Sequence, residues 1–202
     1  MKVFHVTLLI VGLVASASSS SKNVVDNLKD TLEEDIRGIR TRSKELIQLV
    51  YKHLQDDVPA FMKNPLTDST TLINHVTDDA NAVIVSATSD IRTMKYHVEV
   101  AINELKPMDI VLEEILNKLL QQLDDEGRDA AVKKDQLLKQ ASSHAFADAW
   151  LVYNKGADAA RETVLGHVNE DFNFYVTNVR NFIDQVEKYV SVAMIKLQQV
   201  VS

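Results

Sequence analysis

Four long segments of this sequence, in which apolar residues recur every three or four positions, limit its possible folds more than any other feature. That spacing places the apolar side chains on one face of an α-helix. Because each such helix must bury its apolar face, four of them predict an all-α, elongated, antiparallel four-helix bundle. The expected helices run from about 23 to 57, from about 67 to 105, from about 112 to 154 and from about 164 to 200.

Proline and glycine residues are expected to mark the ends of these helices. Pro59 and Pro65 should end the first helix and Pro107 the second, since proline lacks the backbone N–H that a helix interior needs. Residues 67–70, which are Thr-Asp-Ser-Thr, supply candidates for the N-cap of the second helix. Asn154 and Gly156 are expected to stop the third helix.

Three places in the chain allow a different assignment. Residues 83–85 and 174–176 are β-branched or aromatic clusters that would suit short strands. The sequence on either side keeps the helical period, so we expect helix at both. Gly127 could split the third helix and give five helices instead of four.

The two halves of the chain match each other at an offset of 91 or 92 residues, which predicts an internal duplication. A shared helical period alone would align leucine with leucine, but it would not align polar residues. The repeat unit is then an αα-hairpin, present in residues 18–106 and again in residues 107–202, and the two hairpins close into one bundle domain. The polar residues that coincide include His53 with His144, Asp57 with Asp148, His75 with His167, Asp79 with Asp171 and Arg37 with Arg128.

Residues 1–17 have the layout of a secretory signal peptide. A basic start precedes an apolar run from Val3 to Val14, and Ala15-Ser16-Ala17 forms a small-residue cleavage site. The apolar run is too short to span a bilayer. We therefore expect a soluble, secreted, extracellular protein that is not transmembrane. The alternative for this segment is a short, buried N-terminal helix.

The composition of the chain disfavours several classes of function. Its net charge of −7 argues against nucleic-acid binding, because nucleic-acid-binding proteins present a basic face. It contains no cysteine, which excludes thiol catalysis, cysteine-zinc sites and disulfides. The metalloprotease, Walker, dinucleotide-binding and nucleophile-elbow motifs are also missing. We therefore expect a protein that is not an enzyme, with no catalytic residue and no cofactor.

Four histidines are each followed by an aspartate four residues later, which places both side chains on one helix face. Both intra-hairpin turns fall at the same end of an antiparallel bundle, so all four pairs should lie at a similar height. We interpret them as an inward polar layer that binds a divalent metal such as Zn²⁺, or that drives the helices apart when the imidazoles are protonated. The alternative is a set of exposed positions near helix ends, inherited by duplication. The candidate residues are His53, Asp57, His75, Asp79, His144, Asp148, His167 and Asp171.

Aromatic residues provide a second candidate site, an apolar pocket between the helices. Aromatic side chains at helical spacing are more often part of the ordinary core, and this alternative stays open. The candidates for the apolar ligand site are Trp150, Phe172, Tyr175 and Phe182.

These features favour a non-catalytic carrier that binds lipid or another apolar small molecule in or on the bundle. The layout is similar to that of the exchangeable apolipoproteins, which are secreted, cysteine-free and helical, and the similarity is one of architecture. The alternative function is an extracellular protein that binds another protein, or a structural rod that forms a homo-oligomer.

Overall fold

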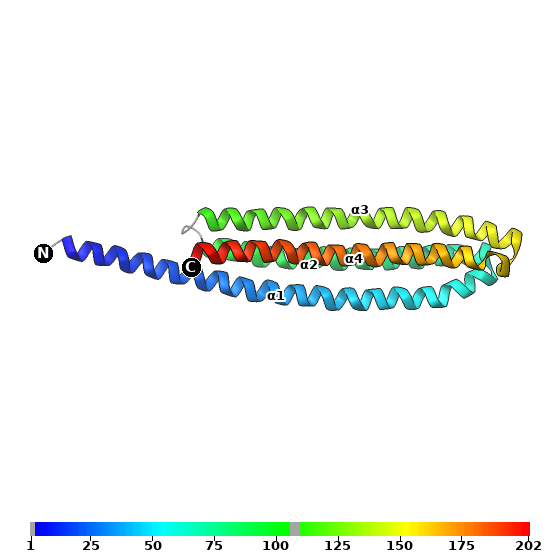
Figure 1. Cartoon of the computed structure of the whole chain (residues 1–202), viewed down its shortest axis with the longest axis horizontal. Helices are drawn as coiled ribbons and strands as arrows, with labels where there is room; N and C mark the ends of the chain where they lie inside the picture. Colours follow the sequence, from blue (N-terminus) through cyan, green and yellow to red (C-terminus); the bar gives the residue numbers. More distant parts are fainter. Residues whose placement is uncertain (1–2, 106–109) are drawn as a thin grey trace. The chain divides into compact units, whose positions relative to one another are not determined.

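Four helices make up the computed structural model, which describes the backbone of residues 3–105 and 110–202 and the side chains of residues 20–105 and 110–202. They are α1 (Val3–Lys63), α2 (Pro65–Leu105), α3 (Ile110–Lys155) and α4 (Ala157–Val201), shown in Figure 1. No strand occurs in the described ranges, so the predicted all-α fold with four packed helices is confirmed.

Two of the ambiguous segments, 83–85 and 174–176, are helical as expected. Gly127 lies inside α3 and does not split it, so the third predicted segment is one helix. Pro107, the expected end of the second helix, lies outside the described residues.

The chain divides into two compact units, and each unit contains a stretch of every helix. Unit 1 consists of Met1–Arg37, Asp90–Asp125 and Gln185–Ser202, and unit 2 consists of Gly38–Ser89 and Glu126–Asp184.

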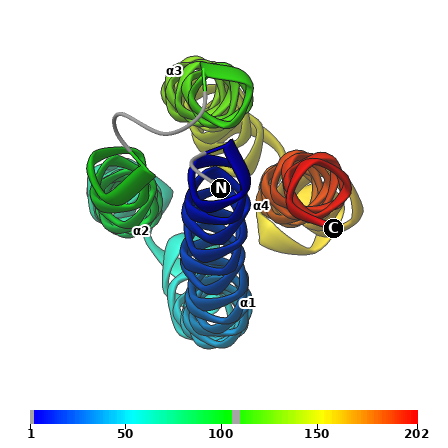
Figure 2. The ribbon, with the colours of Figure 1, turned by 90° about the vertical axis from the view of Figure 1, so that its left-hand side faces the viewer.

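Unit 1 has an aliphatic core to which all four helices contribute. Seen end-on, α2 and α4 lie on opposite sides, and α1 and α3 occupy the other two positions (Figure 2). The buried positions recur every three or four residues, so the period in the sequence corresponds to burial. The largest fully buried side chains of this unit are Val25, Leu32, Met94, Val98, Leu112, Leu116, Leu119, Leu123 and Leu197.

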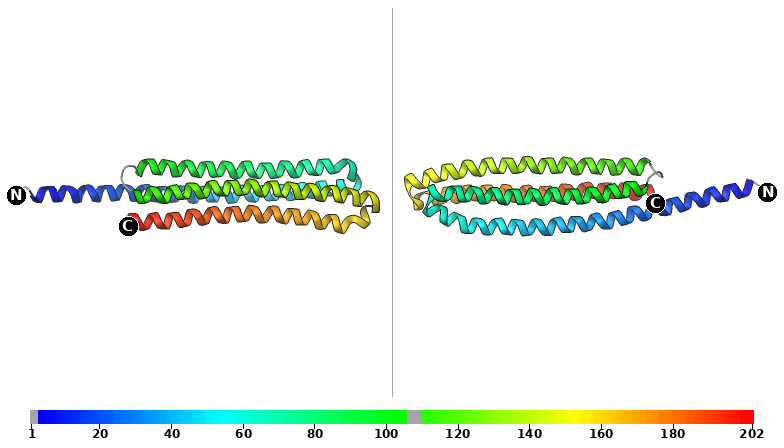
Figure 3. Two further views of the ribbon diagram at one scale, coloured as in Figure 1. Left: turned by 90° about the horizontal axis from the view of Figure 1, so that it is seen from above. Right: turned by 180° about the vertical axis from the view of Figure 1, so that it is seen from behind.

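Unit 2 contains both hairpin junctions and two buried clusters. In both views of Figure 3, α1 reverses into α2 and α3 reverses into α4 at the same end of this unit. All four helices supply residues to the first cluster, which consists of Phe61, Leu72, Ala149, Val152, Ala160 and Val164. They also supply the second cluster, which consists of Val50, Ala80, Leu137, Tyr175 and Val179.

The prediction that Pro59 ends the first helix is wrong, because Pro59 lies inside α1, which continues to Lys63. α1 does end just before Pro65, the second proline expected to end it, and Pro65 begins α2. Pro59 removes one helical hydrogen bond, but its neighbours Val58 and Phe61 are buried, and their burial holds this turn helical.

Asn64 makes the whole connection between α1 and α2. Its carbonyl accepts hydrogen bonds from the backbone N–H groups of Thr67 (3.1 Å) and Asp68 (2.9 Å). Pro65 therefore occupies the first helical position, where a missing N–H costs nothing. The helix starts before the Thr-Asp-Ser-Thr run that was expected to cap it.

Gly156 connects α3 to α4, as the sequence predicted for the end of the third helix. Its φ of 83° is in the left-handed region. Its N–H donates to the carbonyl of Val152 (2.9 Å), and its own carbonyl accepts from the N–H of Ala160 (3.1 Å). One residue thus ends α3 and starts α4.

Residues 3–17, the expected signal peptide, form the beginning of α1. Either alternative for this segment is compatible with a helix, so secretion stays a prediction. Within the described part of the chain, no helix has an apolar stretch long enough to cross a membrane.

Candidate functional site

All eight residues of the predicted polar layer lie in unit 2, two on each helix. The sequence therefore identified a set of residues that one unit brings together. Their carboxylates are more deeply buried than their imidazoles: the Asp148 side chain is 4% exposed, whereas the histidine side chains range from 22% to 46%. The layer thus points its carboxylates inward and leaves its imidazoles partly exposed.

In the α1–α2 hairpin, each histidine contacts the aspartate of the other helix, and its partner is not the aspartate four residues later. His53 Nδ1 lies 2.9 Å from Asp79 Oδ1 and 3.0 Å from Asp79 Oδ2. His75 Nδ1 lies 2.7 Å from Asp57 Oδ2. An ionised carboxylate only accepts, so each imidazole donates from Nδ1. Two hydrogen bonds therefore bridge α1 and α2.

The α3–α4 hairpin repeats this arrangement at the equivalent positions. His144 Nδ1 lies 3.0 Å from Asp171 Oδ1, and His167 Nδ1 lies 2.7 Å from Asp148 Oδ1. We call the four contacts the crossed pairs: His53–Asp79, His75–Asp57, His144–Asp171 and His167–Asp148.

The imidazole rings differ in how they face each other in the two hairpins. The His144 and His167 rings are stacked, with centroids 4.3 Å apart and planes 7° apart. The His53 and His75 rings are 6.0 Å apart and tilted by 39°. Nitrogen lone pairs lie in the ring plane, so two stacked rings do not direct them at one ion at the 2.0–2.1 Å typical of zinc.

Among the side chains that the structure describes, no group of three or more His, Cys, Asp or Glu could hold a metal ion. The crossed pairs occupy each Nδ1 with a carboxylate, so these histidines would ligate a metal through Nε2. Metal binding at these residues stays a prediction.

Two groups of the layer have a raised pKa. The hydrogen bond with Asp57 raises the pKa of His75, with partial burial opposing it and the charges of Asp57, Asp79 and Asp78 adding to it. Burial raises the pKa of Asp171, against the opposing effect of its hydrogen bond with His144. Both shifts mean that the folded chain holds a proton more tightly than the unfolded chain does.

A cavity of about 50 Å³ lies beside the crossed pairs, inside unit 2. It is smaller than the cavity of about 150 Å³ that binds benzene in other proteins, so it does not hold a lipid in this conformation. Tyr175 lines it, and the hydroxyl of this residue is fully buried, with no hydrogen-bond partner among the described residues. The polar side chains around it are Thr77, Asp79, Ser142, His144, Asp148, His167, Asp171 and Tyr175.

The four aromatic residues predicted to bind an apolar ligand do not share one pocket. Phe172 and Tyr175 line the cavity, with their rings 6.4 Å apart. Phe182 is buried away from the cavity lining, and Trp150 is 68% exposed.

An exposed aromatic stripe on α3 was missed by the sequence analysis. Phe146, Trp150 and Tyr153 are 68%, 68% and 62% exposed, and the rings of Trp150 and Tyr153 stack at 6.3 Å. We call these three residues the α3 stripe. The sequence does carry a signal for it, because the buried face of the same helix has the small residues Ala145 and Ala149. In most helices the large apolar side chains are buried, but here the large aromatic side chains are exposed and the small alanines are buried.

Comparisons with models of known protein families, with curated proteins and with solved structures found no match.

Proposed function

We propose that this chain is a secreted, non-catalytic helical-bundle protein that binds lipid or another apolar ligand on the outer surface of α3. The α3 stripe is the observation that carries this proposal, because it exposes three aromatic side chains on consecutive turns of one helix. Exposed apolar patches of this kind usually mark a binding surface. The absence of catalytic motifs in the sequence supports a binding role.

The chemistry of the stripe suits a lipid surface. Tryptophan and tyrosine combine an apolar ring with a polar group, which favours the boundary between lipid and water. The net charge of −7 disfavours strongly anionic membranes. A zwitterionic phospholipid is therefore the ligand that we favour.

Binding on the surface is better supported than binding inside unit 2. The cavity of about 50 Å³ is smaller than a benzene site, and any larger ligand would have to separate the helices. That separation would open both buried clusters, to which all four helices contribute. The carrier that we propose therefore does not need to unfold its bundle.

The size of the stripe argues against a protein partner. A fully covered aromatic side chain buries about 150–250 Å², so three side chains about two-thirds exposed offer roughly 300–500 Å². A stable protein interface buries about 800 Å² on each partner. A protein-binding or homo-oligomeric rod remains the second candidate, and the stripe alone is too small for it.

Two further parts of the proposal rest on the sequence. Export rests on the layout of residues 1–17. Duplication of an αα-hairpin rests on the offset of 91 or 92 residues, and the recurrence of crossed pairs at equivalent positions supports it.

The experiment that tests lipid binding uses Trp150, the single tryptophan of the chain, as its probe. Phosphatidylcholine vesicles should shift its fluorescence emission to the blue, since the exposed indole would enter an apolar environment. The same vesicles should carry the protein upward in a flotation gradient.

Substitutions in the stripe supply the specificity test. Phe146→Ser with Tyr153→Ser keeps the fluorophore and should weaken vesicle binding about tenfold or more, since each large apolar contact contributes about 1.5–3 kcal/mol when fully buried. Val85→Ser is the matched control, because Val85 is 69% exposed on α2 of the same unit. Equal loss in both variants, or no emission shift in the wild type, would refute the proposed site.

A further inference from the structure

The cavity of unit 2 lies where the two halves of the sequence differ in side-chain size. Large side chains of α1 and α4 line one part of it, and alanines of α2 and α3 line another. At the offset of 91 or 92 residues that relates the two halves, each of these alanines corresponds to one of the large residues. The corresponding pairs are Ala141 with Val50, Ala145 with Leu54 and Ala80 with Phe172.

This difference in size accounts for the empty space. Ala80, Ala141 and Ala145 are buried, so each of them occupies a position in the interior. Protein interiors are normally filled to a high density, and a void between buried side chains costs stability. A core with the larger residue at both members of each pair would fill the space. The three alanines therefore keep the cavity open.

The volume of the cavity limits the size of its ligand. One water molecule needs a cavity of roughly 10–15 Å³, and a cavity of about 150 Å³ holds benzene. The cavity of about 50 Å³ lies between these two values. It therefore fits a molecule that is larger than water and smaller than benzene.

The lining of the cavity favours a neutral ligand with an apolar body. Most of the lining residues are aliphatic or aromatic, so the transfer of an ion from water would be costly. The two buried carboxylates of the lining, Asp79 and Asp148, would repel an anion. They already accept hydrogen bonds from His53 and His167, so they are not free to bind a cation.

Tyr175 supplies the polar group with which a ligand can interact. It lines the cavity, and its hydroxyl is fully buried, with no hydrogen-bond partner among the described residues. The charge of Asp79, another lining residue, acts on this hydroxyl, so the two groups lie in the same part of unit 2. A carbonyl oxygen bound in the cavity supplies the acceptor that the hydroxyl lacks.

We propose that the cavity of unit 2 is a binding site for a small, neutral carbonyl compound, of the size of acetone, whose oxygen accepts a hydrogen bond from Tyr175. The site is separate from the α3 stripe, because Phe146, Trp150 and Tyr153 do not line the cavity. Binding in the cavity goes beyond the lipid binding proposed for the stripe and does not depend on it. The failure of either one leaves the other unaffected.

The first test titrates the full chain with acetone and follows the NMR signals of methyl groups. The signals of Val50, Leu137 and Val164, which line the cavity, should shift and reach saturation. The signals of Val98, which is buried in unit 1, should stay unchanged. The absence of a saturable shift at the lining residues would overturn the proposal.

The second test fills the cavity. Ala145→Leu introduces the residue found at the equivalent position of the first hairpin, Leu54, and should abolish the saturable acetone shifts. The matched control is Ala147→Leu, the same substitution at an exposed position of α3 outside the lining, which should bind acetone as the wild type does. Acetone binding that survives Ala145→Leu would overturn the proposal.

Tyr175→Phe decides the matter if Ala145→Leu does not fold, because it keeps the ring and removes only the donor. It should weaken acetone binding about two- to tenfold, the effect of losing one neutral hydrogen bond. It should leave the binding of xenon, which enters apolar cavities without hydrogen bonding, unchanged. Equal acetone affinity in Tyr175→Phe and the wild type would overturn the proposal.

Discussion

The hydroxyl of Tyr175 is a buried polar atom whose desolvation no described protein group offsets. It has no hydrogen-bond partner among the described residues, and it belongs to a residue that lines the cavity of unit 2 and is 5% exposed. Burial, with a smaller contribution from Asp79, raises the pKa of Tyr175, so the phenol stays neutral. A buried polar group without a partner costs about 1–3 kcal/mol.

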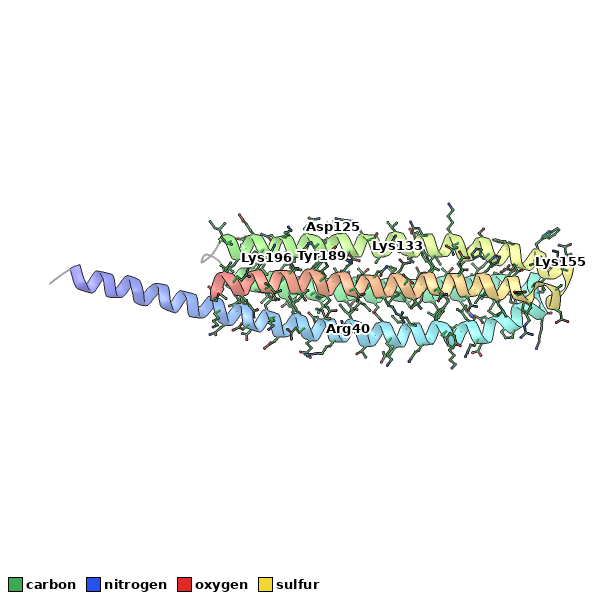
Figure 4. All side chains as sticks on the ribbon, in the orientation of Figure 1. Arg40, Asp125, Lys133, Lys155, Tyr189 and Lys196 are labelled. Atoms are coloured by element: carbon green, nitrogen blue, oxygen red, sulfur yellow. The ribbon has the colours of Figure 1, made fainter. Side chains whose placement is uncertain are left out.

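Tyr175→Phe should therefore increase the free energy of unfolding by about 1 kcal/mol, because it removes the hydroxyl and keeps the ring in its cluster. Urea unfolding measures the change. Tyr189→Phe is the control, since Tyr189 is a partly exposed tyrosine of unit 1 (Figure 4), and its change should be near zero. A loss of stability in Tyr175→Phe would show instead that water in the cavity satisfies the hydroxyl.

At the same scale, the sequence predicted which residues form the polar layer but not which residues pair. A spacing of four brings His53 and Asp57 to one helix face, and that much follows from helix geometry. The partner of His53 is Asp79 because the one-residue junction at Asn64 fixes the register of α2 against α1. That register depends on where each helix ends, and Pro59 was wrongly expected to end the first helix.

At the scale of the elements, the two hairpin junctions show when a local signal decides the structure. Gly156 was correctly predicted as a helix stop, because a left-handed residue is needed there and glycine adopts that conformation without strain. Pro59 was wrongly predicted as a helix end, because the burial of Val58 and Phe61 outweighs the low helix propensity of proline there. Tertiary packing can outweigh a low helix propensity, but it does not remove the strain that a residue with a Cβ has at a positive φ.

Gly156→Ala and Gly166→Ala should consequently change the stability in opposite directions. At both positions an added Cβ would meet no atom within 4 Å, so only the backbone conformation differs. Gly156 has a φ of 83°, and alanine there should cost about 1–2 kcal/mol. Gly166 lies inside α4, where alanine should add about 0.5–1 kcal/mol.

Thermal and urea unfolding of the two glycine variants would measure both changes. A stabilising Gly156→Ala would mean that α3 and α4 join in some other conformation. A destabilising Gly166→Ala would mean that the outer surface of α4 is covered.

For the molecule as a whole, the period of apolar residues was enough to predict four helices, whereas the partners of the polar and aromatic residues depended on tertiary structure. Buried residues such as Leu32 and Leu119 follow from periodicity alone. The α3 stripe was missed because aromatic residues were expected in a pocket between the helices or in the core, although Ala145 and Ala149 already occupy the buried face. Counting side-chain volume on both faces of each helix would have revealed it.

If the two hairpins descend from one ancestor, equivalent substitutions in them should have equivalent effects. Asp57 and Asp148 hold corresponding imidazoles, His75 and His167, each at 2.7 Å. Replacing either aspartate by alanine removes one hydrogen bond from a partly exposed imidazole, which should cost about 0.5–1.5 kcal/mol. Asp148→Ala should cost more, since its side chain is 4% exposed and that of Asp57 is 14% exposed. Asp56→Ala is the control: this exposed position corresponds to Ala147, so its change should stay within about 0.5 kcal/mol. Urea unfolding near neutral pH compares all three, and a neutral Asp57→Ala beside a costly Asp148→Ala would show that only one hairpin depends on its crossed pairs.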